Sequence, residues 1–235
     1  MTDLTILMPV YDERDTVEEA VERTLGTELP VELVELILID DGSTDGTSEV
    51  LDRIARRHPG VRLVRHAVNS GKGAALRTGL QHASGRYTAV MDADLEYDAA
   101  DMPRLIEPLL DRTASVVFGT RGSHPHSVFS LLYVLGNKAV AFTASGLYGT
   151  WLVDIMTGLK AMPTELFRSL RLGRDGFDIE AEITARSLLD GHDIYEVPVS
   201  YRARRREAGK KLTAVDGLRV MRTLIGCRIE GLARE

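Results

Sequence analysis

Cysteine and tryptophan are almost absent from this sequence of 235 residues, which holds one of each. The single cysteine, Cys227, excludes an internal disulfide and a cysteine-based zinc site. No signal-peptide pattern precedes the first strand-like segment, so we expect a protein of the reducing cytoplasm. Because 44% of the residues are hydrophobic, the chain has enough apolar side chains for a large core.

No stretch of the sequence is apolar enough to be a plausible membrane span. Residues 128–151 come closest, with five aromatic residues and no acidic one, but Asn137 and Lys138 fall at their middle. A lysine at the centre of a span costs about 2.5 to 3.5 kcal/mol to insert. We therefore expect one or two partly buried helices here that touch a membrane surface without crossing it.

Two common nucleotide-binding signatures are also missing. No G-x-G-x-x-G turn follows the first predicted strand, which removes the strongest sign of a nicotinamide or flavin cofactor. Residues 69–73 read Asn-Ser-Gly-Lys-Gly and lack the G-x-x-x-x-G-K-[ST] spacing, so a P-loop nucleoside triphosphatase is rejected.

Charge is distributed unevenly along the chain. The formal charge of -6 argues against general nucleic-acid binding. Residues 202–211, however, carry six basic residues and one glutamate, a net of +5 that leaves -11 for the remainder. An isolated charge run is usually a solvated loop, but this one follows a predicted core strand and contains a glycine. We predict that it meets an anion, which is a diphosphate, another phosphate group or an anionic membrane surface.

Short apolar runs alternate with segments of helical spacing over about the first 120 residues. Strands are predicted at residues 4–10, 34–39, 61–66, 87–91 and 115–118, with a helix after each of the first four. Ser43 or Thr44 is expected to cap the second helix, and Asp101 the fourth. The alternation predicts an α/β fold, a mostly parallel sheet with helices on both faces, in a single domain.

After residue 128 the alternation stops. A helix is predicted at residues 178–189 and a strand at 194–201. The last element is a helix with one apolar stripe, formed by Val215, Leu218, Met221, Leu224, Ile225, Ile229 and Leu232.

Acidic residues follow two of the predicted strands. Asp40 and Asp41 end the second strand, and Asp92 and Asp94, with Glu96 two residues further on, end the fourth. Ligands of open α/β sheets lie beyond the carboxyl ends of the strands. We predict that one acidic end binds a base or ribose and that the other holds Mg²⁺ or Mn²⁺ against a diphosphate. The alternative is that these aspartates merely begin turns.

Several motifs, taken in order, closely resemble those of family 2 glycosyltransferases with the GT-A fold. They are Pro9-Val10-Tyr11-Asp12-Glu13, Asp40-Asp41-Gly42-Ser43-Thr44-Asp45-Gly46-Thr47, Asn69-Ser70-Gly71-Lys72-Gly73, Asp92-Ala93-Asp94 and Gly119-Thr120-Arg121. Later segments, at residues 154–160, 176–180, 196–201 and 209–211, resemble the polyprenyl-phosphate sugar transferase branch, which includes dolichyl-phosphate mannosyltransferases. The resemblance implies a GT-A Rossmann-like domain over residues 1–211, followed by an amphipathic helix over residues 212–235.

The resemblance also implies roles in the donor site. Asp41 would bind the nucleobase, Glu13 the ribose, and Asp94 the metal. The implied donor-binding residues are Pro9, Tyr11, Glu13, Asp41, Lys72, Asp92 and Lys211, and the implied metal ligands are Asp92, Asp94 and Glu96. For Tyr11 the alternative is packing under the sheet edge, and for Lys72 we favour an exposed lysine at the helix start.

Other residues are implied for the acceptor. Arg121 resembles an arginine that contacts acceptor phosphate in the family, and we expect Arg202 and Arg204 to join it. Asp154 lies where related enzymes keep a carboxylate near the acceptor, although it could equally cap the turn that follows it. The predicted catalytic residues are thus Asp94, Arg121 and Asp154. A phosphate acceptor needs no strong base, whereas a hydroxyl acceptor needs one, and Asp154 is the candidate.

These expectations predict an inverting, metal-dependent glycosyltransferase that moves a sugar from a UDP- or GDP-sugar to a polyprenyl phosphate. The alternative is a soluble hydroxyl acceptor, since the transmembrane pair that many relatives carry after the catalytic domain is not found. A non-enzymatic nucleotide-sugar binding module is disfavoured because both acidic strand ends are retained. We expect a cytoplasmic protein, peripheral on the inner face of the cell membrane, with no nucleic-acid partner.

Overall fold

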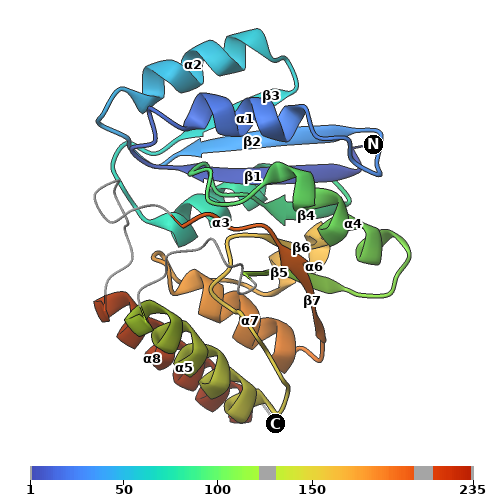
Figure 1. Ribbon diagram of the computed structural model, residues 1–235, viewed down its shortest axis with the longest axis vertical. Coiled ribbons are helices and arrows are strands. Elements are labelled where there is room, and N and C mark those ends of the chain that lie inside the picture. Colours follow the sequence, from blue (N-terminus) through green and yellow to red (C-terminus); the bar gives the residue numbers. More distant parts are fainter. Residues whose placement is uncertain (1, 122–130, 204–213, 234–235) are drawn as a thin grey trace.

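One seven-stranded sheet forms the centre of the molecule (Figure 1). The computed structural model describes residues 2–121, 131–203 and 214–233. The strands are β1 (Leu4–Val10), β2 (Val34–Asp40), β3 (Val61–Arg65), β4 (Tyr87–Val90), β5 (Val116–Arg121), β6 (Lys160–Pro163) and β7 (Ile194–Val199). Their order in the sheet is β3-β2-β1-β4-β6-β5-β7. Strand β6 runs antiparallel to β4 and β5, and the other neighbouring strands are parallel, which confirms the predicted mostly parallel sheet.

Helices cover both faces of this sheet. They are α1 (Val17–Leu25), α2 (Thr47–Arg57), α3 (Lys72–His82), α4 (Met102–Leu110, after the 3-10 turn Ala99–Asp101), α5 (Leu131–Tyr148), α6 (Thr164–Ser169), α7 (Ile179–Leu189) and α8 (Ala214–Leu232). Because side chains alternate along a strand, Ile6 and Met8 of β1 pack with α1, α2 and α4, whereas Leu7 packs with α3, α6 and α7. The predicted α/β class with two covered faces is confirmed.

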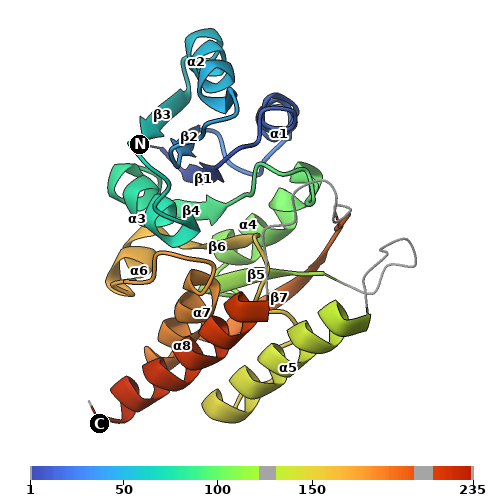
Figure 2. The same ribbon diagram turned by 90° about the vertical axis from the view of Figure 1, so that its left-hand side faces the viewer.

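Helices α5 and α8 form an outer layer that packs on α7 rather than on the sheet. Figures 1 and 2 show the two helices side by side, with α7 between them and the strands. Their buried contacts form a third apolar cluster, which includes Val140 and Ala144 of α5 and Val220, Leu224 and Cys227 of α8. None of the helices in the described ranges is both long and apolar enough to cross a membrane.

The predicted cap of α2 is wrong. This helix begins at Thr47, and the carboxylate of Asp45 accepts the backbone N–H of Thr47 at 2.9 Å. Ser43 makes a tertiary contact instead, because its hydroxyl accepts the backbone N–H of Asp12 at 3.1 Å. The carboxylate of Asp12 in turn accepts the backbone N–H of Thr44 at 2.8 Å. These contacts join the loop after β2 to the loop after β1, next to the candidate site.

Two further expectations are corrected by tertiary packing. Asp101 makes no cap hydrogen bond, and its carboxylate accepts the backbone N–H of Ser200 at 2.6 Å, beyond the end of β7. The predicted stripe of the last helix is divided between two sides: Leu224 is buried, whereas Leu218 and Ile229 are exposed.

Candidate active site

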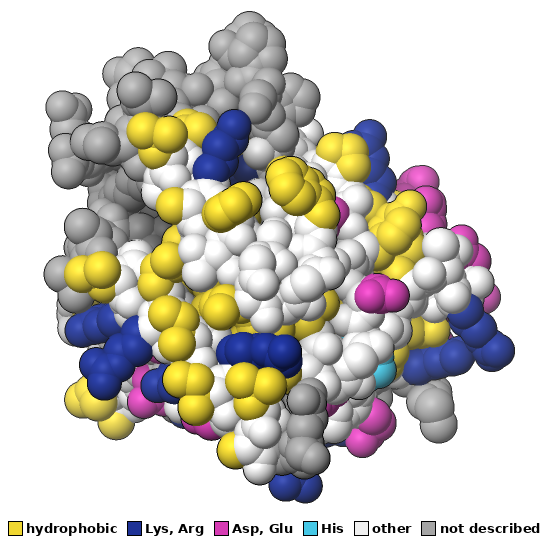
Figure 3. Space-filling view, turned by 90° about the horizontal axis from the view of Figure 1, so that it is seen from below, with side chains coloured by type: hydrophobic (Ala, Val, Ile, Leu, Met, Phe, Trp, Pro, Cys, Tyr) yellow, Lys and Arg dark blue, Asp and Glu magenta, His cyan; other side chains and the backbone are white. Residues whose placement is uncertain are grey.

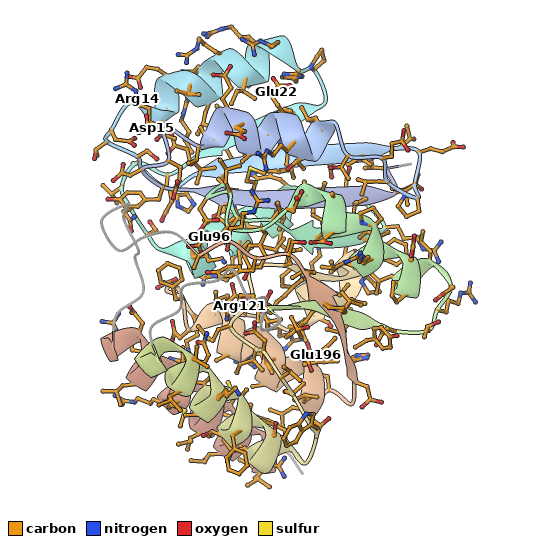
Figure 4. All side chains as sticks on the ribbon, in the orientation of Figure 1. Arg14, Asp15, Glu22, Glu96, Arg121 and Glu196 are labelled. Atoms are coloured by element: carbon orange, nitrogen blue, oxygen red, sulfur yellow. The ribbon has the colours of Figure 1, made fainter. Side chains whose placement is uncertain are left out.

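A pocket of about 340 Å³ lies at the carboxyl ends of β1, β2, β4 and β5, where the parallel strands present their acidic residues. Nine of the predicted site residues line it: Pro9, Tyr11, Glu13, Asp41, Lys72, Asp92, Asp94, Glu96 and Arg121. Figure 4 shows Glu96, which follows β4, and Arg121, which ends β5, at this same edge of the sheet. Seven of these nine residues are acidic or basic, and the pocket gathers them into one concave surface.

Asp41 holds one wall of the pocket in place. Its carboxylate accepts the backbone N–H groups of Ser70 at 2.9 Å and Gly71 at 2.8 Å. The imidazole of His66 lies 2.6 Å from the same carboxylate and is itself fixed by the hydroxyl of Thr78 at 2.9 Å. Gly71 has φ +95°, a conformation that favours glycine, and this turns the loop into the start of α3. Asp41 is thus both a pocket residue and the anchor of the loop before α3.

Lys72, at the start of α3, is bound to Asp92. Its ammonium lies 2.7 and 2.9 Å from the two oxygens of the Asp92 carboxylate. The Lys72 side chain is only 10% exposed, so the expectation of an exposed helix-start lysine is wrong. Burial alone would lower the pKa of Lys72, but the adjacent Asp92 and Glu180 carboxylates outweigh it and raise the pKa above its ordinary value. The pocket therefore keeps a permanent cation beside the acidic end of β4.

Glu180 lies between two buried lysines. One of its oxygens is 2.8 Å from the Lys72 ammonium, and the other contacts the ammonium of Lys160. Lys160, 1% exposed, also donates to the carbonyl of Thr157 at 2.6 Å. Burial would raise the pKa of the Glu180 carboxyl, but the two ammonium groups hold that pKa below its ordinary value. Buried charges of alternating sign thus connect the pocket to the sheet interior.

Gly158 allows this arrangement because it has no side chain. A Cβ at position 158 would lie 2.0 Å from an oxygen of Asp92 and 3.0 Å from the ring of Tyr97. The backbone N–H of Gly158 donates to the Tyr97 hydroxyl at 2.8 Å, and burial raises the pKa of that hydroxyl. The turn before β6 therefore packs directly against the acidic end of β4.

Glu96 joins the end of β4 to the segment that follows β7. Its carboxylate accepts a hydrogen bond from the Tyr201 hydroxyl, and its carbonyl accepts the backbone N–H of Arg202 at 2.7 Å. The Tyr201 ring packs edge-on against Tyr97, with the ring centroids 5.1 Å apart. The carboxylate of Asp94 accepts the backbone N–H of Glu96 at 3.0 Å. Asp94, Glu96, Tyr97 and Tyr201 thus form one wall of the site.

Arg121 and Asp154 form a buried, two-pronged ion pair. The Nε and a terminal nitrogen of Arg121 donate to the two oxygens of Asp154 at 2.6 and 2.7 Å, and both side chains are less than a tenth exposed. The guanidinium also lies 5.2 Å from the centre of the Tyr201 ring. Asp154 is held from behind, because Glu196 accepts its backbone N–H at 2.9 Å, and burial raises the pKa of the Glu196 carboxyl.

Carboxylates at the acidic end of β4 are the candidate ligands of a divalent cation. Within residues 2–121, 131–203 and 214–233, no three His, Cys, Asp or Glu side chains converge closely enough to form a metal cage. Magnesium sites of phosphate-transferring enzymes use one or two carboxylates and complete the shell with substrate phosphates and water. Asp94 and Glu96 line the pocket, and Asp92 beside them is already paired with Lys72. These residues fit a cation that is shared with a bound diphosphate.

Other predicted site residues lie away from the pocket lining. Asp154 reaches the pocket through Arg121, and its carboxylate accepts the backbone N–H of Met156 at 3.2 Å, so it also caps the turn that follows it. Arg202 is exposed. Arg204 and Lys211 lie outside the described residues, as does most of the basic segment 202–211.

The lining residues that were not predicted include Tyr97, Glu180 and Tyr201. Glu180 had a sequence signal, because it lies one helical turn from the apolar Ile183 and therefore shares its buried face. Tyr201 ends the predicted strand at residues 194–201, but the side to which its ring turns depends on how β7 ends. Tyr97 had no signal beyond its nearness to Asp94.

Comparisons with known sequences agree with the motifs. The sequence model described as Glycosyl transferase family 2 matches residues 5–169. Glycosyltransferase AglJ of Haloferax volcanii is 28% identical over 199 residues, which are 83% of this chain and 62% of that protein. Dodecaprenyl-phosphate galacturonate synthase of Rhizobium johnstonii is 28% identical over 172 residues, which are 72% of this chain and 50% of that protein. The chain spans less than two thirds of the length of either relative.

A solved structure shares the fold. Glucosyl-3-phosphoglycerate synthase from Mycobacterium tuberculosis, crystallised with Mn²⁺, UDP and phosphoglyceric acid, matches with a TM-score of 0.72 and 23% sequence identity. The match covers 98% of this chain and 78% of that chain. At this identity the likeness is one of fold, and it agrees with the GT-A arrangement expected from the motifs.

Proposed function

The chain belongs to glycosyltransferase family 2, and we propose that it transfers a sugar from a nucleoside-diphosphate donor to a polyprenyl-type lipid phosphate, with inversion at the anomeric carbon. The observation that carries the proposal is the pocket in which Asp41, Asp92 and Asp94 meet the cations Lys72 and Arg121. Carboxylates suit the base and ribose of a nucleotide, and cations suit the phosphates of the donor and acceptor. The similarity to dodecaprenyl-phosphate galacturonate synthase supports the lipid acceptor.

The donor lies along the ends of β1 and β2 in this proposal. Asp41 is 3% exposed and accepts hydrogen bonds from ring N–H groups of the base. These bonds use the carboxylate lone pairs that its contacts with the loop before α3 do not occupy. Glu13, 8% exposed, binds the ribose, and its carboxylate is oriented by the Thr16 hydroxyl at 2.7 Å. Pro9 and Tyr11 complete the surface on which the nucleoside lies. The nucleotide is a UDP or GDP derivative.

Asp94, with Asp92 and Glu96 beside it, would hold Mg²⁺ or Mn²⁺. When bound, the cation stabilises the charge of the departing nucleoside diphosphate. Lys72 keeps the Asp92 carboxylate in one orientation through two contacts and reduces the repulsion between the acidic cluster and the donor phosphates. The protein thus presents a site whose net charge suits a diphosphate only when a cation accompanies it.

Arg121 binds the acceptor phosphate and Asp154 keeps it in position. A phosphate oxygen is already anionic, so its attack on the anomeric carbon requires no strong base. Both oxygens of Asp154 accept from Arg121, and Glu196 holds its backbone, which supports a positioning role for Asp154. An acceptor that is part of a lipid also implies peripheral contact with a membrane, at its cytoplasmic face, where nucleotide sugars are available.

The test is sugar transfer in detergent from labelled UDP- and GDP-sugars to a short-chain polyprenyl phosphate, with the free polyprenol as the matched acceptor. We expect transfer to the phosphate and none to the alcohol. Asp94→Asn should lose most of the transfer to the phosphate. Asp193→Asn, a change at an exposed residue outside the pocket, should transfer sugar as wild type does. Transfer to a soluble hydroxyl acceptor, with no lipid phosphate used, would favour the alternative acceptor.

A further inference from the structure

Helix α8 carries two apolar stripes on opposite sides. The inner stripe, Val220, Leu224 and Cys227, is buried against α5 and α7. The outer stripe is exposed: Leu218 by 73%, Ile225 by 45%, Ile229 by 63% and Leu232 by 54%. These four residues are spaced by seven, four and three positions, so they lie on one side of the helix. Nothing in the described residues accounts for an outward stripe of this size.

Helix α5 adds to the same outer layer. Leu135 and Phe142, two helical turns apart, are exposed by 53% and 72%, while Val140 and Ala144 face the interior. Figure 3 views the molecule from below, the side on which α5 and α8 lie, and shows hydrophobic side chains lying between Lys and Arg side chains. We call the outward residues Leu135, Phe142, Leu218, Ile225, Ile229 and Leu232 the outer face.

Cations accompany the outer face, and the acids of both helices are few. Helix α5 contains no acidic residue, and its Lys138 is exposed. In α8, Arg222 lies between Leu218 and Ile225 along the outer stripe. The two acids of α8 are engaged, since Asp216 pairs with Arg219 at 3.5 Å and Glu230 lies 3.7 Å from Arg186.

A cationic hollow adjoins the outer face between the start of α7 and the middle of α8. It is lined by Arg174, Arg219 and Arg222, together with Asp178 and Thr223. The one carboxylate, that of Asp178, accepts the Thr223 hydroxyl at 3.0 Å and lies 4.0 Å from Arg174, which leaves it outnumbered by three guanidinium groups. The hollow therefore offers guanidinium donors to an anion, and guanidinium groups bind phosphate oxygens in a forked geometry.

The combination of apolar side chains and cations decides between two possible occupants. A second copy of the chain would cover the apolar side chains, but a symmetric pair brings the same patch against itself and so gathers Lys138 and Arg222 with their copies. An anionic bilayer matches both features, because its acyl boundary accepts apolar side chains and its headgroups attract cations.

We propose that the outer face of α5 and α8 docks the enzyme on an anionic bilayer, with lipid phosphates in the hollow lined by Arg174, Arg219 and Arg222. The inference deepens the proposed function and rests on it, because a polyprenyl phosphate is presented at a bilayer surface. The short segment 174–178 connects the hollow with the active site, because Phe177 lines the active-site pocket and Arg174 and Asp178 line the hollow. Docking by this face brings the active site next to the headgroups.

The experiment is flotation of the full chain with phosphatidylcholine vesicles and with vesicles that also contain phosphatidylglycerol. Wild type should float with the anionic vesicles and lose this binding in high salt. Phe142→Ser/Ile229→Ser should lower the binding by at least about tenfold, since two apolar anchors are removed. Arg222→Ala should lower it by about fivefold on anionic vesicles only. The matched controls, Leu33→Ser and Arg56→Ala, change exposed residues of other surfaces and should bind as wild type does.

The transfer assay in detergent separates this inference from the proposed function. Circular dichroism and transfer to short-chain polyprenyl phosphate should be unchanged in Phe142→Ser/Ile229→Ser. If wild type fails to float, or if this variant floats equally well, the docking inference is wrong even when transfer proceeds. If wild type floats but uses no lipid phosphate, the acceptor assignment is wrong. A vesicle-free dimer that the double variant dissociates would identify the outer face as a self-association surface and overturn docking.

Discussion

Replacing Lys160 by methionine should destabilise the protein severely. Lys160 is 1% exposed, and its ammonium donates to the carbonyls of Ile155 at 3.2 Å and Thr157 at 2.6 Å, besides its contact with Glu180. Methionine preserves the length of the side chain but removes the charge. The Glu180 carboxylate, 3% exposed, is then left with Lys72 alone on one of its two oxygens.

The magnitude follows from the burial of the pair. Removing one partner of a buried ion pair costs about 3 to 5 kcal/mol, because the other charge remains desolvated. For a domain of this size each kcal/mol lowers Tm by about 2 to 4 °C, so Lys160→Met should lower Tm by roughly 6 to 20 °C. Adding Glu180→Gln removes the carboxylate charge that has lost its Lys160 partner. The double variant should therefore recover about 1 to 3 kcal/mol of the free energy of unfolding. The matched control is Arg23→Met, whose ion pair with Glu19 is half exposed and contributes at most about 1 kcal/mol.

Thermal and urea denaturation followed by circular dichroism measure these differences. The reasoning is refuted if Lys160→Met and Arg23→Met cost the same, or if adding Glu180→Gln makes Lys160→Met less stable. The pH dependence gives a second readout. The folded-state pKa of Glu180 lies below its ordinary value of 4.5, so its contribution is present above about pH 4.5 and is lost as the pH falls through the folded-state pKa. Glu180→Gln should lack this part of the acid-induced loss.

Three further predictions concern the pocket. Asp94→Asn should lower kcat/KM by about 100-fold or more and abolish the metal dependence of nucleoside-diphosphate binding in calorimetry, while the fold survives. Asp41→Ala should weaken nucleotide binding by about 10- to 100-fold in competition assays, because a charged acceptor is lost and its buried N–H donors are orphaned. Gly158→Ala should lower kcat/KM by about 100-fold, because its Cβ would lie 2.0 Å from an Asp92 oxygen, whereas Gly60→Ala has open space and should be neutral.

Each of these three predictions has an outcome that would contradict it. If the affinity for nucleoside diphosphate is undiminished in excess EDTA, the donor site does not use a metal. An Asp41→Ala variant that binds its preferred nucleotide as tightly as wild type would exclude a contact with the base. Equal kinetics of the Gly158 and Gly60 variants would mean that the orientation of Asp92 does not matter for turnover.

The sequence alone determined six of the seven strands and the edge on which the site lies, whereas β6, antiparallel between β4 and β5, was not predicted. Alternating strand and helix patterns require parallel strands with helical crossovers, and parallel strands place their carboxyl ends at one edge. For this reason Asp41, which follows β2, and Asp94, which follows β4, line one pocket as expected. These features are local: a few residues on either side of each strand end suffice to specify them.

The tertiary structure decided which charges meet. The side chain of Lys72 is buried because the segment before α7 bonds to the start of α3, and Glu180 of α7 reaches the Lys72 ammonium. No local pattern near residue 72 contains that information. Likewise Ser43 does not cap α2, because the loop after β1 lies close enough to occupy its hydroxyl. In both cases a side chain with several possible partners takes the one supplied by a distant segment.

The same distinction applies to the last helix. Periodicity in the sequence shows which residues of α8 share a side, since the period of 3.6 residues is a property of the helix itself. It does not show which side packs, because that depends on the surface that α5 and α7 offer. Only the structure shows that Leu224 lies inside while Leu218 and Ile229 lie outside, where apolar area remains for a partner to cover.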